Sequence, residues 1–173
     1  TLVYGGTEVA EGDTLTLTAA EIATLIYYAT KDQYGDDFAS FSFMVNDGEF
    51  TSVESTMTIN VNPLNDRPTI DPLSLDISEI DEGGSVTLTV DFDDVDAGDT
   101  HEVEINWGDG TVEIFDRAAG SSYDFTHTYT DDPEGDTAAY TITAKVTDDA
   151  QTPLSAEATV EVTVNNVAPG EIL

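Results

Sequence analysis

Residues 101–130 read HEVEINWGDGTVEIFDRAAGSSYDFTHTYT, and this stretch decides the fold class. Within it, segments 101–107, 111–115 and 123–128 alternate apolar and polar residues, and clusters rich in Asp and Gly separate them. An alternation of period two is typical of β-strands with one buried face. Short strands at such intervals are typical of sandwiches. The sequence therefore predicts an all-β protein built from antiparallel β-sandwiches.

Working outward, the same alternation predicts further strands at residues 14–18, 25–28, 39–46, 55–61, 85–92, 138–147 and 156–164. Only residues 19–23 suit a helical turn. Residues 62–68, NPLNDRP, end an alternating strand with two prolines, which cannot donate hydrogen bonds to a sheet. We therefore predict two tandem modules, residues 1–66 and 67–173. The first begins late in the expected pattern and is predicted to lack an opening strand.

The composition is strongly acidic, with 36 Asp and Glu against 4 Lys and Arg and a net charge of −32. Such a charge repels nucleic acid and anionic membranes, so cations are the expected partners. Solubility is the alternative reason for the acidity. The absence of cysteine excludes disulfides and thiolate metal sites. No run approaches the roughly 20 apolar residues of a membrane span, and we predict no membrane insertion.

Two stretches carry family resemblances. Residues 67–173, with DEGGSVTLTVDFDDVDAGDTHEVEINWGDGT, FTHTY and NNVAP, resemble a PKD domain, in which the WGDG motif places a core Trp before a hairpin. Residues 1–66, with EGDTLTLTAAEIATLIY and NDRP, resemble cadherin-like repeats of large bacterial adhesins. The resemblances imply two tandem Ig-like or cadherin-like sandwiches from a longer bacterial protein, secreted or on the cell surface. They imply spacer, adhesion or ligand-display roles.

Acidic and amide side chains concentrate in loops that would meet if the two predicted modules stacked head to tail. Carboxylates brought together in this way repel one another, and Ca²⁺ accepts six to eight oxygen ligands in tolerant geometry. The resemblance to cadherin-like repeats implies the same ion at such a junction. The predicted ligands are Glu11, Asp36, Asp37, Asn65, Asp66, Asp91, Asp93, Asp94, Asp96, Asp99, Asp148 and Asp149.

A second, partial metal cluster is predicted at the opposite end of the second module. Its other half would come from a following module, so we expect this cluster to be only partial. Its members are Glu82, Asp131, Asp132, Glu134, Asp136, Asn165 and Asn166.

The leading hypothesis is that calcium at the module junction stiffens a monomeric, multidomain surface protein, with neighbouring modules of the same chain as its partners. The alternative is a module that recognises carbohydrate or a host or cell surface, and an inert spacer is a third. We predict no enzyme, because neither His101 nor His127 belongs to a recognisable nucleophile motif.

Overall fold

The computed structural model describes residues 1–96, 98–130 and 137–167. The chain divides into two compact units, Thr1–Leu64 and Asn65–Leu173. This division falls before Asn65, whereas the sequence analysis sets the boundary after Asp66. The difference has a simple cause, because Asn65 and Asp66 both form hydrogen bonds with residues of the second unit.

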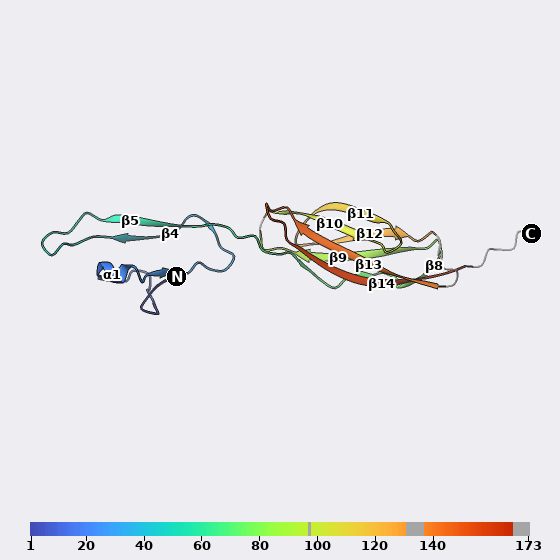
Figure 1. Cartoon of the computed structure of the whole chain (residues 1–173), viewed down its shortest axis with the longest axis horizontal. Helices are drawn as coiled ribbons and strands as arrows, with labels where there is room; N and C mark the ends of the chain where they lie inside the picture. The colour runs from blue at the N-terminus through green and yellow to red at the C-terminus, as the bar shows by residue number, and fades with distance from the viewer. Residues whose placement is uncertain (97, 131–136, 168–173) are drawn as a thin grey trace, which may run out of the picture. The chain divides into compact units, whose positions relative to one another are not determined.

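The second unit is a β-sandwich of two sheets (Figure 1). The larger sheet has the strand order β11–β10–β13–β14–β8, and the smaller has the order β12–β9–β6, with β7 also paired to β9. Every pair is antiparallel except β14 with β8. The strands are β6 (Thr69–Ile70), β7 (Ser74–Leu75), β8 (Glu79–Asp81), β9 (Ser85–Asp93), β10 (Thr100–Asn106), β11 (Val112–Ala118), β12 (Ser121–Thr128), β13 (Thr137–Asp148) and β14 (Ser155–Asn165).

The core of this sandwich follows directly from the alternating sequence. Along β9 the side chains of Val86, Leu88, Val90 and Phe92 are all buried, and the residues between them are less buried. β10, β13 and β14 contribute apolar side chains to the same core in the same way. Burial of this kind contributes about 25 cal/mol per Å² of apolar surface, which makes it the main stabilising term of the unit.

The hairpin between β10 and β11 packs Trp107 in the core, as the sequence predicts, and Trp107 has no exposed surface. Gly108 has a φ of +84°, and a Cβ there would lie 2.7 Å from the carbonyl oxygen of Thr141. Only glycine therefore fits at this position. The hydroxyl of Tyr129 donates to the Trp107 carbonyl over 2.8 Å, which joins the hairpin to the chain beyond β12.

The first unit has a different character. It contains a three-stranded sheet of β1 (Leu2–Tyr4), β2 (Thr7–Glu8) and β3 (Ile26–Tyr27), the helix α1 (Ala19–Ile22), and a hairpin of β4 (Gly35–Phe43) and β5 (Ser55–Val61). No residue of Thr1–Leu64 is buried. The strands of this unit are thus formed without a closed core.

The prediction of an all-β chain is confirmed, and α1 lies where a helical turn is expected. A capping box begins this helix: the Thr18 amide donates to the Glu21 carboxylate over 2.8 Å, and the Thr18 hydroxyl accepts from the Glu21 amide. The predicted strand at residues 14–18 is wrong, because this alternating run pairs with no other strand. No helix within the described ranges is long and apolar enough to cross a bilayer.

Candidate functional site

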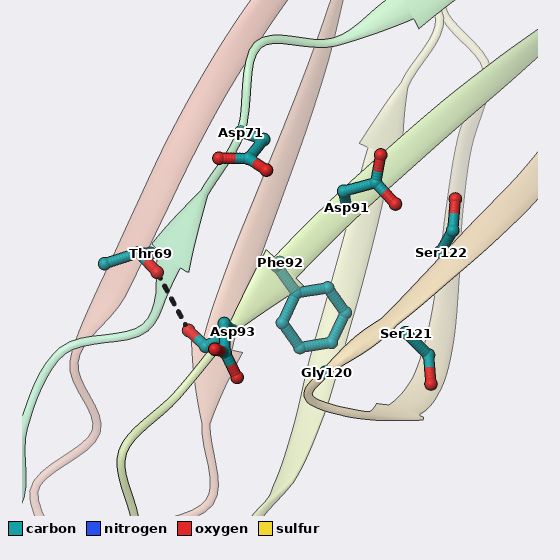
Figure 2. A pocket seen from close by; sticks show the side chains of 8 residues that line it. All are labelled: Thr69, Asp71, Asp91, Phe92, Asp93, Gly120, Ser121 and Ser122. Atoms are coloured by element: carbon teal, nitrogen blue, oxygen red, sulfur yellow. Dashed lines mark hydrogen bonds between the residues drawn. The ribbon is translucent and has the colours of Figure 1, made fainter.

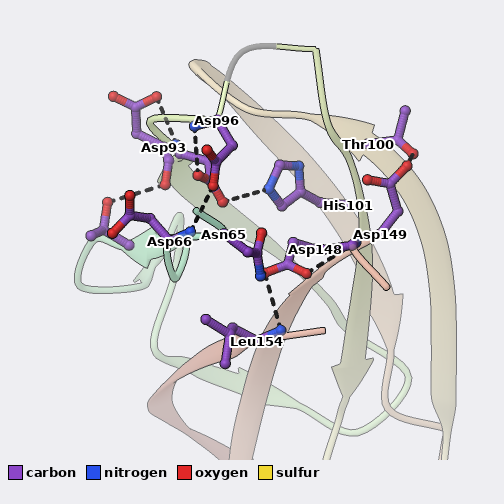
Figure 3. Close-up of polar contacts among 12 residues, drawn as sticks. Asn65, Asp66, Asp93, Asp96, Thr100, His101, Asp148, Asp149 and Leu154 are labelled. Carbon is purple, nitrogen blue, oxygen red and sulfur yellow. Dashed lines mark hydrogen bonds and ion pairs between the residues drawn. The ribbon is translucent and has the colours of Figure 1, made fainter. Parts of the chain in front are cut away.

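A chain of hydrogen bonds joins the segment Asn65–Asp66 to the loop that follows β9 (Figure 3). The Asp66 amide donates to Oδ2 of Asp96 over 2.7 Å. The Asp96 amide in turn donates to Oδ1 of Asp94 over 3.0 Å. The side chain of Asp96 therefore holds Asp66 against the loop, and the side chain of Asp94 holds Asp96 within it. We call the end of the second unit that carries these residues the proximal end.

His101 of β10 completes this chain of contacts from inside the sandwich. Its Nε2 lies 3.0 Å from Oδ2 of Asp94, and both side chains are fully buried. Its Nδ1 has no hydrogen-bond partner. A proton on Nδ1 would be a buried donor without an acceptor, so Nε2 is the ring nitrogen that donates to Asp94. The Asp94 carboxylate thus accepts a hydrogen bond from the core.

Asp148, at the end of β13, organises the next turn. Its carboxylate accepts from the amide of Leu154 over 3.0 Å, from the amide of Ala150 over 3.2 Å and from Nδ2 of Asn65 over 3.1 Å. The residue is 3% exposed. With three N–H donors, this buried carboxylate is well compensated, and it ties Asn65 to the β13–β14 turn.

Asp99, in the loop after β9, and Asp149, directly after β13, also belong to the proximal end, and their pKa values are shifted in opposite directions. Burial raises the pKa of Asp99, and the nearby charges of Asp149, Asp96 and Asp94 raise it further. The hydroxyl of Thr100 donates to Asp149 over 2.7 Å and lowers the pKa of that carboxyl group. The carboxylates of Asp149, Asp96 and Asp94 thus disfavour a negative charge on Asp99.

The donor atoms of the proximal end are carboxylate and amide oxygens, which suit a hard cation such as Ca²⁺. Among the described residues, however, no three His, Cys, Asp or Glu side chains are grouped so that they could hold a metal ion. Asp94, Asp96 and Asp148 direct oxygens toward N–H donors instead. The chemistry of the donors fits calcium, but a coordination cage is not preformed.

Asp91 and Asp93, predicted as loop ligands, lie on β9, which runs through Asp93. Pairing of Thr69 with Asp93 extends the strand one residue beyond its predicted end at Phe92. The two side chains line a cavity of about 280 Å³ together with Asp71, Thr69, Ser121 and Ser122 (Figure 2). Asp93 also accepts the Asp94 amide over 2.9 Å, so it adjoins the proximal end, whereas Asp91 lies farther along β9.

The three predicted ligands of the first unit are all exposed. Glu11 lies in a turn, and Asp36 and Asp37 lie near the start of β4. Asp37 has a φ of +54°, and its amide donates to Oδ1 of Asn60 over 2.9 Å. That these residues share an ion with the second unit stays a prediction.

At the opposite end of the second unit, Glu82 and Asn165 lie close together. The Glu82 amide donates to the Asn165 carbonyl over 2.9 Å, and Nδ2 of Asn165 donates to Glu79 over 2.9 Å. Glu79, Asp81, Glu82 and Asn165 line a cavity of about 680 Å³, and Asn166 is exposed. The remaining predicted members, Asp131, Asp132, Glu134 and Asp136, lie outside the described residues.

Sequence reasoning missed three residues of these two clusters. Glu79 and Asp81 alternate around Ile80 on a short edge strand, and this S-E-I-D pattern could have placed both carboxylates on the outer face. For His101 the sequence shows only that no nucleophile motif surrounds it. Its position within an alternating strand could have placed it in the core, but its partner Asp94 could not have been identified from spacing.

Comparison with known proteins supports this description. A family model for the PKD domain matches residues 65–164. The chain is also 35% identical over 74 residues to "Integrin beta-like protein B" of Dictyostelium discoideum, an alignment that covers 38% of this chain and 4% of that protein. The chain thus spans only a small part of this relative. A β-sandwich with this match is an extracellular, adhesion-type module, a class that is typically non-enzymatic. The chain belongs to the PKD domain family.

Proposed function

We propose that this chain is a calcium-binding extender of a multidomain extracellular protein, in which Ca²⁺ at the proximal end stiffens the attachment of the PKD domain to the module before it. Neighbouring modules of the same chain are the proposed partners. The observation that carries the proposal is that Asn65 and Asp66, the first residues of the PKD domain, are hydrogen-bonded to Asp148 and Asp96 in its acidic loops.

Two carboxylates about 5 Å apart repel by roughly 0.8 kcal/mol at the dielectric constant of water, and by more where solvent is partly excluded. Several such pairs make the proximal end unfavourable unless a cation is present. A divalent cation replaces this repulsion with attraction, and Ca²⁺ tolerates irregular sets of oxygen ligands.

The hydrogen bonds of the proximal end explain why binding there would affect the attachment. Asn65 and Asp66 begin the second unit, and both are bonded to the loops that carry the acidic side chains. In this proposal Asp66, Asp99 and Asp149 turn carboxylate oxygens toward the ion. Asp94 remains a positioning residue, because the buried His101 holds it.

The proposal is tested by calorimetric titration of Ca²⁺ into the chain. We expect saturable binding, and we expect Asp99→Asn and Asp66→Asn each to weaken it at least tenfold, which corresponds to about 1.4 kcal/mol. Asp116→Asn on the exposed face of β11 is the matched control and should bind like the parent chain. Equal affinity in all four proteins would reject the site.

Carbohydrate recognition by the second unit has less support than calcium binding. Sugar-binding surfaces use exposed aromatic rings, but within the described part of the second unit no aromatic side chain is exposed. Trp107, Phe125 and Tyr129 are all buried. The proposed parent is therefore a spacer or adhesion protein, and a bacterial origin and a cadherin-like first unit stay predictions.

A further inference from the structure

The protein has only four basic residues, and all four lie in the described ranges: Lys31, Arg67, Arg117 and Lys145. A protease that cuts after Lys or Arg therefore has four bonds to choose from. Such a protease holds the cationic side chain in a pocket with a carboxylate at its base. It also needs a stretch of backbone that can open locally and enter its active site. The four positions differ strongly in both respects.

Arg117 is held among aromatic side chains of the sandwich. It lies in β11, which pairs with β10 along its whole length. Its guanidinium carbon is 5.1, 5.2 and 5.5 Å from the ring centroids of Phe115, Tyr123 and Phe125. Its Nη1 also donates to the carbonyl of Asp116 over 2.8 Å. A protease could take up this side chain only after these cation–π contacts and hydrogen bonds were broken.

The bonds after Lys145 and Arg67 are protected in other ways. Lys145 is exposed, but it lies within β13, where it pairs with Glu104 of β10 on one side and Glu157 of β14 on the other. Its backbone cannot leave without opening the larger sheet. Arg67 precedes Pro68, which is buried. A proline after the cut bond fits a protease poorly, because it has no N–H and its φ is fixed.

Lys31 lies in an exposed segment between β3 and β4. Residues 28–34 belong to no strand or helix, and every one of them is exposed. The side chain of Lys31 itself is 86% exposed. A hydrogen bond from the Gln33 amide to the Thr30 carbonyl, over 3.2 Å, closes the turn. A surface turn of this kind opens at little cost in free energy, so the bond after Lys31 is available to a protease.

The strands before and after Lys31 do not pair with each other. β1, β2 and β3 form one sheet, and β4 pairs only with β5. The rings of Tyr27 and Phe38 meet edge to face across the segment, with centroids 6.5 Å apart. No residue on either side of Lys31 within Thr1–Leu64 is buried. After a cut at Lys31, little apolar burial would therefore hold the two parts together.

We propose that the Lys31–Asp32 bond is a processing site for Lys- and Arg-specific proteases, at which cleavage separates the PKD domain from the sequence before Asp32. The reaction is hydrolysis: water adds as the C–N bond breaks, Lys31 gains a carboxylate, and Asp32 gains a free amino group. The protease supplies the catalytic groups. Asp32 slows the reaction, because its carboxylate pairs with the Lys31 ammonium over 3.0 Å and competes with the carboxylate of the protease pocket.

Limited digestion of the folded chain with trypsin, followed by intact-mass spectrometry, tests the proposal. The first cut should fall after Lys31, and the fragment of residues 32–173 should persist. Lys31→Gln should slow the first cleavage more than about tenfold, because every other basic site needs a larger opening. Lys145→Gln makes the same change of charge within the sheet and should be cut like the parent chain. Asp32→Asn should be cut faster than the parent chain.

The chain unfolded by heat is the reference, and it should be cut after Lys31, Arg117 and Lys145 alike. A first cut of the folded chain after Arg117 or Lys145 would overturn the proposal. Cleavage that is no slower in Lys31→Gln would also overturn it. So would a folded parent chain that stays intact at a trypsin concentration sufficient to digest the unfolded reference.

Discussion

The two units contain similar alternating sequences but differ in what they bury. In the second unit β9 is paired on both sides, by β12 and by β6 with β7, and its four apolar side chains are fully enclosed. In the first unit β4 and β5 alternate just as clearly, yet neither contains a buried residue. Alternation specifies a strand and its two faces, but burial requires a second sheet to cover the apolar face.

Replacing Trp107 with alanine should have the largest effect, because it opens a cavity at the centre of the second unit. We expect the free energy of unfolding of that unit to fall by about 3–5 kcal/mol. Phe50→Ala in the first unit should change stability by less than about 0.5 kcal/mol, since the ring is 69% exposed. Urea unfolding measures the loss of stability in both variants. Equal losses would contradict the conclusion that only the second unit has a closed core.

His101→Ala should cause the second largest loss in the free energy of unfolding. The substitution leaves the buried Asp94 without its partner from β10, and we expect a loss of about 2–3 kcal/mol. Thr100→Ala, one residue earlier and exposed, should cost less than about 1 kcal/mol. Chemical denaturation of the two variants compares them. A loss no greater than that of the neighbour would mean that the buried pair does not stabilise the proximal end.

Asp109 of the WGDG hairpin should show a pH dependence. Burial raises the pKa of Asp109, but hydrogen bonds from His127 and Thr111 outweigh this and lower it overall. Its stabilisation is therefore present above the unfolded pKa of about 3.9 and is lost as the pH falls through the folded value. Asp109→Ala should cost about 1 kcal/mol at neutral pH and little in acid. A pH-independent difference in melting temperature would contradict this assignment.

The carboxyl group of Asp99 should affect stability in the opposite direction to that of Asp109. Of the four substitutions, its replacement should change stability least. Its pKa is raised, so ionisation of this carboxyl group destabilises the folded state above the folded pKa. Asp99→Asn should therefore raise the melting temperature at neutral pH in EDTA. The gain should vanish below the unfolded pKa of about 3.9, where both proteins are uncharged at this position. A variant that melts below the parent chain in EDTA would refute the proposed repulsion.

The sequence predicts the fold better than it predicts the candidate site. Alternation and the WGDG motif are sufficient for the strands and for the buried Trp107. Spacing also identifies Asp94 and Asp96 as neighbours in one loop. It does not reveal that Asp94 points into the core toward His101, nor that Asp148 serves its own turn, because both depend on tertiary contacts. The strand predicted from the alternating run at residues 14–18 is absent for the same reason, because a strand needs a partner to pair with.

Calcium binding at the proximal end is best measured by thermal unfolding of the parent chain and of Asp99→Asn, in EDTA and in millimolar Ca²⁺. We expect the order of the two melting temperatures to reverse: the variant melts higher in EDTA, and the parent chain melts higher in calcium. A hundredfold excess of Ca²⁺ over its Kd would stabilise the parent chain by about 2.7 kcal/mol. Melting temperatures that calcium leaves unchanged in both proteins would contradict calcium binding at the proximal end.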